Sequence, residues 1–302
     1  MRNLRSVDLN LLVALDAFVA EPSVTRAAAR LGLSQPAASN MLSRLRVLFE
    51  DPLLVRTSSG MQPTERAREL HEALVPILRG MERLFESRLA FDPATTTRSF
   101  SVRMSDVLVA LFLPLVTPSF LRLAPQASMK ITHLPPHETL DALEADRLDL
   151  AVSMGLEHGR SILSRPILRE RMVCVMRAGH EAERGEFDTE RFLAQRHVRV
   201  SVSANDQRFV DHTLSQMTLQ REVALQLPYW TLLPSVLEDT DLVSVVPESL
   251  MRRFGPGFVS RPLPFPSDAF DWCVYWHRRH EGNPAQAWLV ERFAEAGEAL
   301  KG

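Results

Sequence analysis

VTRAAARLGLSQPAASNMLS, at positions 24–43, has the pattern of two short helices joined by a tight turn. Ala27, Ala28 and Leu31 recur at helical spacing, which predicts one buried face. Gly32 follows where a residue without a Cβ reverses the chain at least cost, and Ser34 is a favourable N-cap for the next helix. These features predict a helix-turn-helix whose second helix enters the DNA major groove.

The second helix is expected to present a polar face opposite its apolar one. The groove-facing residues are predicted to be Gln35, Ser39, Asn40, Ser43, Arg44 and Arg46. Gln and Asn pair with adenine, Arg pairs with guanine, and Ser reaches a base or a phosphate. Positions 24–46 hold four Arg and no acidic residue, which suits approach to phosphates. The alternative is an ordinary helical hairpin in an all-α core.

A short hairpin is predicted after this motif, over the stretch DPLLVRTSSGMQPT at 51–64. Residues 53–56 are predicted to form a strand, 58–60 a tight turn, and 61–62 the returning strand. Such a ribbon is a wing, and Arg56 on it is expected to reach a phosphate or the minor groove. The alternative is that Arg56 is a solvated charge.

A long helix is predicted from the N-cap Thr64 to about residue 91, with Pro76 expected to kink it. Its apolar residues alternate at steps of four and three, which is an a/d seam. A seam of this kind needs a partner helix, most simply the same helix of a second subunit. Packing against the chain's own body is the alternative. The seam residues are Leu70, Leu74, Ile77, Met81 and Leu84.

Strands and helices alternate from residue 94 to the end, which predicts parallel sheets with helices on both faces, arranged in two lobes. The expected organisation is a winged helix-turn-helix at 1–64, a linker and dimerisation helix at 65–93, a first lobe at 94–167 plus 267–302, and a second lobe at 168–266. Ligands in such sheets bind at the carboxyl ends of strands, so a cleft between the lobes is the expected site.

Composition restricts the class of protein. With 302 residues, 45% hydrophobic content and a net charge of −2, the chain has enough apolar residues for several cores, and any contact with nucleic acid must be local. Cys174 and Cys273 lie about a hundred residues apart and are expected to be free thiols in a reducing compartment. We expect no cofactor, no metal, no signal peptide and no membrane span, and hence a soluble cytoplasmic protein.

A winged helix-turn-helix, a linker helix and two α/β lobes, in this order, resemble the LysR-type transcriptional regulators. The resemblance rests on DLNLLVALDAFVAEPSVTRAAARLGLSQPAASNMLSRLRVLFEDPLLVRTSSGMQPT at 8–64 and LDLAV at 148–152, and covers essentially the whole chain. The opening DLNLL, the wing phrase and FDP at 91–93 are most similar to the branch of nodulation and aromatic-degradation regulators. Members of that branch respond to small aromatic molecules, and the resemblance implies the same kind of effector here. It also implies that the two lobes form a periplasmic-binding-protein-like effector domain.

The resemblance also implies positions for both sites. Ser34, Gln35, Pro36, Ala37 and Ser39 match the start of the recognition helix, and the segment at 54–56 matches the wing. It further implies a homodimer or homotetramer on double-stranded DNA, and contact with RNA polymerase. The positions implied to touch a small-molecule effector are Ser105, Asp106, Ser153, Ser201, Ser203, Asn205, Tyr229, Trp230 and Thr231.

The chemistry of these cleft residues favours a flat aromatic ligand. Their hydroxyls and two helix N-termini suit a carboxylate or phenolate, and Tyr229 with Trp230 would form an aromatic wall. Acidic residues at both helix starts, Asp106 and Asp206, argue against a strongly anionic ligand. The alternative for the two aromatic residues is plain core packing.

Other classes of function fit the sequence less well. The motifs GxSxG, SxxK and HExxH are absent, which disfavours an enzyme, and His277 with His280 is expected to form a solvated rim. A solute-binding protein would not explain the first 90 residues. A DNA-binding regulator that works without an effector remains the main alternative.

Overall fold

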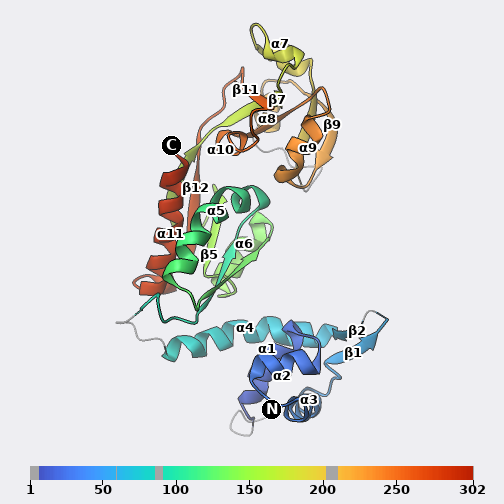
Figure 1. Cartoon of the computed structure of the whole chain (residues 1–302), viewed down its shortest axis with the longest axis vertical. Coiled ribbons are helices and arrows are strands. Elements are labelled where there is room, and N and C mark those ends of the chain that lie inside the picture. The colour runs from blue at the N-terminus through green and yellow to red at the C-terminus, as the bar shows by residue number, and fades with distance from the viewer. Residues whose placement is uncertain (1–6, 59, 86–90, 202–209, 302) are drawn as a thin grey trace. The chain divides into compact units, whose positions relative to one another are not determined.

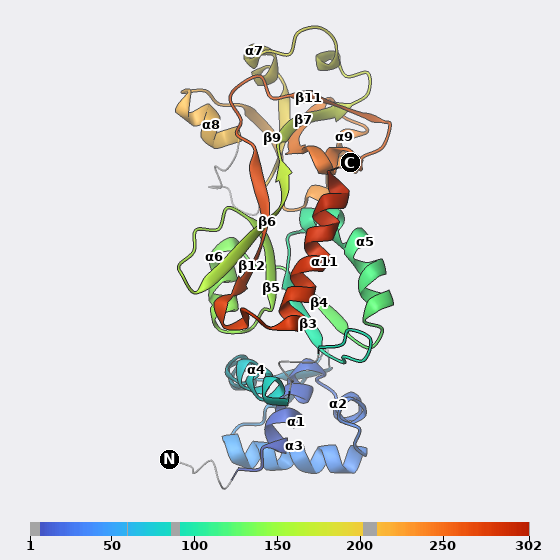
Figure 2. The same ribbon diagram turned by 90° about the vertical axis from the view of Figure 1, so that its left-hand side faces the viewer.

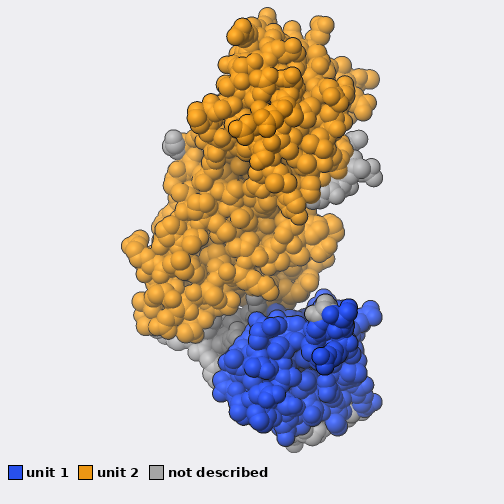
Figure 3. Space-filling model, turned by 45° about the vertical axis from the view of Figure 1, so that its right-hand side comes forward, with its two compact units in different colours: residues 1–87 blue, residues 88–302 orange. Residues whose placement is uncertain are grey.

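The computed structural model describes residues 7–58, 60–85, 91–201 and 210–301. The chain divides into two compact units, residues 1–87 and residues 88–302, shown in two colours in Figure 3. Each unit has its own buried core. The N-terminal unit contains α1 (Asn10–Ala20), α2 (Val24–Leu31), α3 (Gln35–Phe49), β1 (Leu54–Thr57), β2 (Gly60–Pro63) and α4 (Glu65–Phe85).

The N-terminal unit confirms the predicted helix-turn-helix and wing. Small side chains let α2 and α3 cross closely, because Ala27, Ala28 and Ala38 are all buried. β1 and β2 pair antiparallel, from Leu54 opposite Pro63 to Thr57 opposite Gly60. The long helix α4 begins after Thr64, whose Oγ1 accepts from the Ala67 amide at 3.0 Å as the predicted cap requires.

The C-terminal unit holds two five-stranded sheets, which we call lobe I and lobe II (Figure 1). The strand order is β4-β3-β5-β12-β6 in lobe I and β11-β7-β10-β8-β9 in lobe II. The strands of lobe I are β3 (Ser99–Arg103), β4 (Ser128–Thr132), β5 (Leu150–Met154), β6 (Ile162–Glu170) and β12 (Phe270–His277). Those of lobe II are β7 (Met172–Arg177), β8 (Arg196–Val200), β9 (Glu222–Leu227), β10 (Leu242–Pro247) and β11 (Phe258–Pro262).

Both sheets are mixed, so the prediction of purely parallel sheets is wrong. In lobe I, β3 pairs parallel with β4 and β5, whereas β12 pairs antiparallel with β5 and β6. In lobe II, β8 pairs parallel with β9 and β10, whereas β7 pairs antiparallel with β10 and β11. The antiparallel strands are those next to the two crossings between lobes, where the chain enters a sheet from its neighbour rather than from a covering helix.

Helices cover both sheets, as Figure 2 shows for α5 and α11 beside the strands of lobe I. Gly297 of α11 packs so closely on β6 that an added Cβ would lie 2.0 Å from the Ile167 carbonyl oxygen. The helices of lobe I are α5 (Asp106–Leu123), α6 (Pro136–Glu144), the 3₁₀ turn η4 (Arg278–His280) and α11 (Pro284–Leu300). Those of lobe II are η2 (Glu181–Glu183), α7 (Thr189–Leu193), α8 (Val210–Gln216), η3 (Trp230–Leu232), α9 (Leu233–Leu237) and α10 (Glu248–Met251).

Helix α5 corrects the expectation that no segment is long and apolar enough to cross a membrane. Its 18 residues pass by length and composition alone. In the fold, however, this apolar character fills the core of the C-terminal unit, because Leu108, Leu111, Phe112 and Val116 are fully buried there.

Candidate functional site

The turn between α2 and α3 is built by the predicted residues. Gly32 adopts a left-handed conformation at φ 65°, and its amide donates to the carbonyl groups of Ala28 and Ala29. The Ser34 hydroxyl accepts from the Ala37 amide at 3.4 Å, and Pro36 occupies the first turn of α3. The start of α3 is therefore fixed by local hydrogen bonds that do not involve its outward face.

The outward face of α3 carries polar side chains, and the helix contains no acidic residue. Arg44 and Ser43 are among those with partners within the unit. Arg44 forms an ion pair with Asp8 at 2.9 Å, and the Ser43 hydroxyl donates to the Ser39 carbonyl at 3.1 Å. The predicted groove-facing residues that lie exposed are Gln35, Ser39, Asn40, Ser43, Arg44 and Arg46.

Arg46 has a partner that the sequence did not suggest. Its Nε donates to the Pro52 carbonyl at 2.9 Å, and its Nη2 donates to the Leu54 carbonyl at 3.4 Å. The guanidinium group therefore ties the end of α3 to the start of the wing. Arg56 lies further along β1 and is exposed.

The wing is also tied to the long helix α4. The Asp51 carboxylate accepts from the Leu53 amide at 2.6 Å and from the Thr64 hydroxyl at 2.7 Å. The same hydroxyl caps α4 through the Ala67 amide. A single hydrogen-bonded chain thus connects the wing with the first turn of α4.

The predicted seam on α4 does not form one continuous exposed stripe. Leu74 is buried and Leu70 half-buried in the unit's own core beside α1, because α4 completes the helix-turn-helix core. Leu74 therefore packs within its own unit, which was the alternative for this helix, and the intersubunit seam stays a prediction for the more exposed positions of α4. Ile77 is 55% exposed and Met81 is half-buried, whereas the Leu84 side chain lies outside the described residues.

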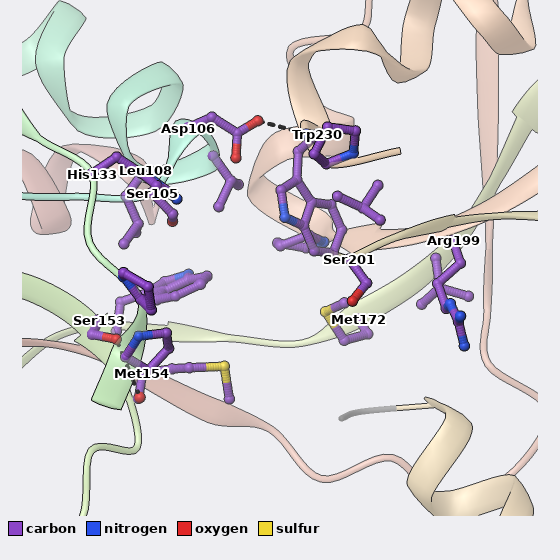
Figure 4. A pocket seen from close by; sticks show the side chains of 18 of the residues that line it. Ser105, Asp106, Leu108, His133, Ser153, Met154, Met172, Arg199, Ser201 and Trp230 are labelled. Atoms are coloured by element: carbon purple, nitrogen blue, oxygen red, sulfur yellow. Dashed lines mark hydrogen bonds between the residues drawn. The ribbon is translucent and has the colours of Figure 1, made fainter. Parts of the chain in front are cut away.

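A cavity of about 350 Å³ opens between lobe I and lobe II. Figure 4 shows its walls, with Ser105, Asp106, His133 and Ser153 from lobe I and Ser201 and Trp230 from lobe II. Five predicted effector residues line it: Ser105, Asp106, Ser153, Ser201 and Trp230. Ser203 and Asn205 lie outside the described residues.

Two predicted effector residues lie away from this cavity. Tyr229 is 51% exposed and Thr231 is also exposed, and neither lines the space. The wall is therefore not the predicted pair of Tyr229 and Trp230. A second tryptophan, Trp272 of β12, lines it with Trp230.

Asp106 bridges the two lobes. Its carboxylate accepts from the backbone amides of Trp230 at 2.5 Å and Thr231 at 3.2 Å. Asp106 lies in the first turn of α5 in lobe I, and both amides belong to the start of η3 in lobe II. This carboxylate thus accepts hydrogen bonds from two amides at the start of a helical turn in the opposite lobe. It also interacts favourably with the dipole of its own helix, because it lies in the first turn of α5.

Sequence reasoning missed several lining residues because their order in the chain gives no sign of their proximity. Met154 and Met172 come from different sheets, and the buried Arg103 donates to the Leu134 and Val152 carbonyl groups. Arg221 and Asp211 line the part of the cavity that lies in lobe II. The Arg221 guanidinium pairs with both carboxylate oxygens of Asp211, at 2.7 and 2.8 Å.

Several titratable groups are buried in the C-terminal unit. Burial, together with the nearby Arg221, lowers the pKa of His197 to about 4. Burial raises the pKa of the free Cys174 thiol to about 12. His280 is also buried and bonds to Asp146 at 3.0 Å, so the prediction that it belongs to a solvated rim was wrong.

Comparison with known families matches both units. Residues 9–68 match the model of the bacterial regulatory helix-turn-helix protein, lysR family, and residues 94–298 match that of the LysR substrate binding domain. The chain belongs to the LysR family of transcriptional regulators. The fold and the predicted resemblance are thereby confirmed.

Relatives of this LysR regulator include two named transcriptional activators. NagR of a Ralstonia species is 30% identical, over 97% of this chain and 98% of that protein. NahR of Pseudomonas putida is 31% identical, over 95% and 96%. Nodulation protein D 1 of Sinorhizobium fredii is 32% identical, over 96% and 91%. These relatives are regulators or nodulation proteins, which places the chain with non-enzymes at the level of the family.

Solved structures agree with this assignment. The probable transcriptional regulator PA0477 of Pseudomonas aeruginosa superimposes with a TM-score of 0.82 and is 29% identical, covering 97% of this chain and 98% of its own. CbnR in complex with its target DNA gives a TM-score of 0.65 at 17% identity, covering 97% and 100%, and supports the fold alone.

Proposed function

We propose that this LysR regulator binds an operator through the outward face of α3 and the wing, and that a small aromatic effector in the cleft between the lobes modulates this binding. The DNA-contacting set is Ser34, Gln35, Pro36, Ala37, Ser39, Asn40, Ser43, Arg44, Arg46 and Arg56, with Arg46 acting through the wing. We further propose the domain bounds 1–64, 65–93, 94–170 with 267–302, and 171–266. The predicted bound at 167 moves to 170 because β6 of lobe I ends at Glu170. The protein works in the cytoplasm as a dimer or tetramer that contacts RNA polymerase.

The observation that carries the effector proposal is the cavity of about 350 Å³ with Trp230 on one lobe and Trp272 on the other. Its volume lies at the lower end of the range for small-molecule sites and suits one or two rings. The methionines supply adaptable apolar surface, and the hydroxyl groups of Ser105, Ser153 and Ser201 supply polar contacts. A ligand that touches both lobes would change the free energy of their closed arrangement.

A thermal-shift screen of the full-length chain tests this proposal with benzoates, phenols and flavonoids. A compound that binds the cleft should raise the Tm. Trp230→Ala should abolish the shift, whereas Tyr229→Ala, which removes the neighbouring aromatic group outside the cavity, should leave it unchanged. Equal loss in both variants, or shifts that persist in Trp230→Ala, would contradict the proposed site.

One observation favours the alternative of a regulator that needs no effector. The bonds from Asp106 to η3, together with one from Arg253 to the Leu111 carbonyl at 3.1 Å, join the lobes through the chain's own groups. Operator affinity that does not change with any compound of the screen would support this alternative.

A further inference from the structure

Val47 has the largest exposed fraction among the exposed large apolar side chains of the described residues, at 75%. It lies on α3, nine residues after the fully buried Ala38. At 3.6 residues per turn, nine residues span about two and a half turns, so the two side chains point in opposite directions. Val47 is therefore directed straight away from the core of its own unit.

The neighbours of Val47 on this face are the side chains expected in the groove. Asn40 lies seven residues earlier and Ser43 four residues earlier, and both are exposed. These spacings place all three on one side of the helix. The serines at 39 and 43 are small, so a surface that covers this face can approach the helix backbone closely.

Neither helix formation nor solvation accounts for a valine at this position. β-Branched residues have a lower helix propensity than the long polar residues that usually occupy solvent-facing positions. The core does not use the side chain, since it is three-quarters exposed. The Val47 side chain is therefore free to contact a partner outside the chain.

We propose that Val47 is a specificity-determining residue whose methyl groups pack on the C5-methyl group of a thymine in the operator. In the major groove, the thymine methyl is the apolar feature that distinguishes one base from the others. Near Val47, Asn40 and Ser43 are polar, Arg44 is held in its ion pair with Asp8, and Glu50 caps α3 three residues later. The methyl groups of Val47 therefore suit an apolar feature of a base edge rather than a phosphate. The thymine lies toward the C-terminal end of α3, away from the base contacted by Gln35.

This inference rests on α3 as the recognition helix, and its test separates the two claims. The full-length chain is used to select its operator from a random DNA pool. Each thymine of the selected half-site is then replaced singly by deoxyuracil, which removes only the methyl group. Binding is measured for the unmodified chain, for Val47→Ala, and for Val13→Ala, which makes the same change at a 46% exposed position of α1.

One deoxyuracil position should weaken binding by the unmodified chain and by Val13→Ala about fourfold, as expected for the loss of one buried methyl-sized contact. Val47→Ala should bind the thymine operator about fourfold more weakly and be insensitive to that replacement. The proposal is overturned if Val47→Ala keeps the same deoxyuracil dependence, or if its mass by light scattering drops, which would assign Val47 to a subunit interface. Failure to select any operator would instead overturn DNA binding by α3.

Discussion

Arg46 and Pro52 connect the recognition helix to the wing, because the Arg46 Nε donates to the Pro52 carbonyl oxygen at 2.9 Å. A second bond reaches the Leu54 carbonyl at the start of β1. The orientation of the wing, and with it the position of Arg56, therefore depends on a residue of α3. We propose that Arg46, which sequence reasoning placed in the groove, acts on DNA binding by positioning the wing.

Arg46→Gln should weaken operator binding by displacing the wing. Arg56→Ala alone should reduce the slope of log affinity against log salt by about 1, the loss of one phosphate contact. In the Arg46→Gln background, the same Arg56→Ala change should alter the slope little. Fluorescence anisotropy across a salt series measures this, and fully additive effects of the two substitutions would show that Arg46 contacts DNA directly.

Leu74 and Ile77 lie one turn apart on α4 but have different environments, at 5% and 55% exposure. Leu74→Ala should lower the free energy of unfolding by about 2–5 kcal/mol, because it leaves a cavity in the N-terminal core. Ile77→Asp should reduce the oligomer mass in light scattering with little loss of Tm. An unchanged mass in Ile77→Asp would remove this part of α4 from the subunit interface.

Asp106→Asn should weaken the connection between the lobes. The neutral amide is a poorer acceptor than the carboxylate for the two amides of η3, and a hydrogen bond to a charged group contributes about 1.5–3 kcal/mol. Hydrogen exchange at Trp230 and Thr231 should accelerate about tenfold or more. Asp268→Asn, at an exposed position, serves as the control, and equal exchange in both variants would contradict the bridge.

His197 predicts an acid sensitivity of lobe II. Its pKa in the folded chain is lowered to about 4 by burial, from an ordinary value near 6.5. The unfolded chain therefore takes up the proton first, so the stability contributed by neutral His197 is complete above about pH 6.5 and is lost as the pH falls toward 4. The loss amounts to about 3 kcal/mol at most. Urea unfolding of the chain and of His197→Gln between pH 7 and 4.5 should diverge, and parallel profiles would contradict this assignment.

The helix-turn-helix and the wing were predictable because their signals are local. Gly32 in its left-handed conformation, the Ser34 cap and the Thr64 cap each act within a few residues, and all three are observed. Arg46 and Pro52 are also only six residues apart, but their hydrogen bond was not predicted. Helical periodicity shows that the Arg46 side chain is exposed, and it does not distinguish an arginine that faces the groove from one that faces the wing.

The cleft was predictable only in part, because its walls come from strands far apart in the chain. Ser105 and Trp230, which family resemblance suggested, line the cavity, and their contact with an effector stays a prediction. Trp272 and Met172 could be recognised as lining residues only once the strand order was known. Tyr229 was misplaced because adjacent side chains point in different directions at the start of η3. Trp230 faces the cavity, whereas Tyr229, one residue earlier, faces solvent. The burial of Leu74 was missed because an a/d pattern does not say which partner covers it.

The most direct test of the central claim compares binding of the full-length chain to its selected operator and to a scrambled duplex, with and without Gln35→Ala. The account predicts that Gln35→Ala weakens operator binding by about 1–3 kcal/mol, leaves scrambled-duplex binding unchanged, and does not shift the Tm. Equal operator affinity for both proteins would show that α3 does not read the DNA sequence.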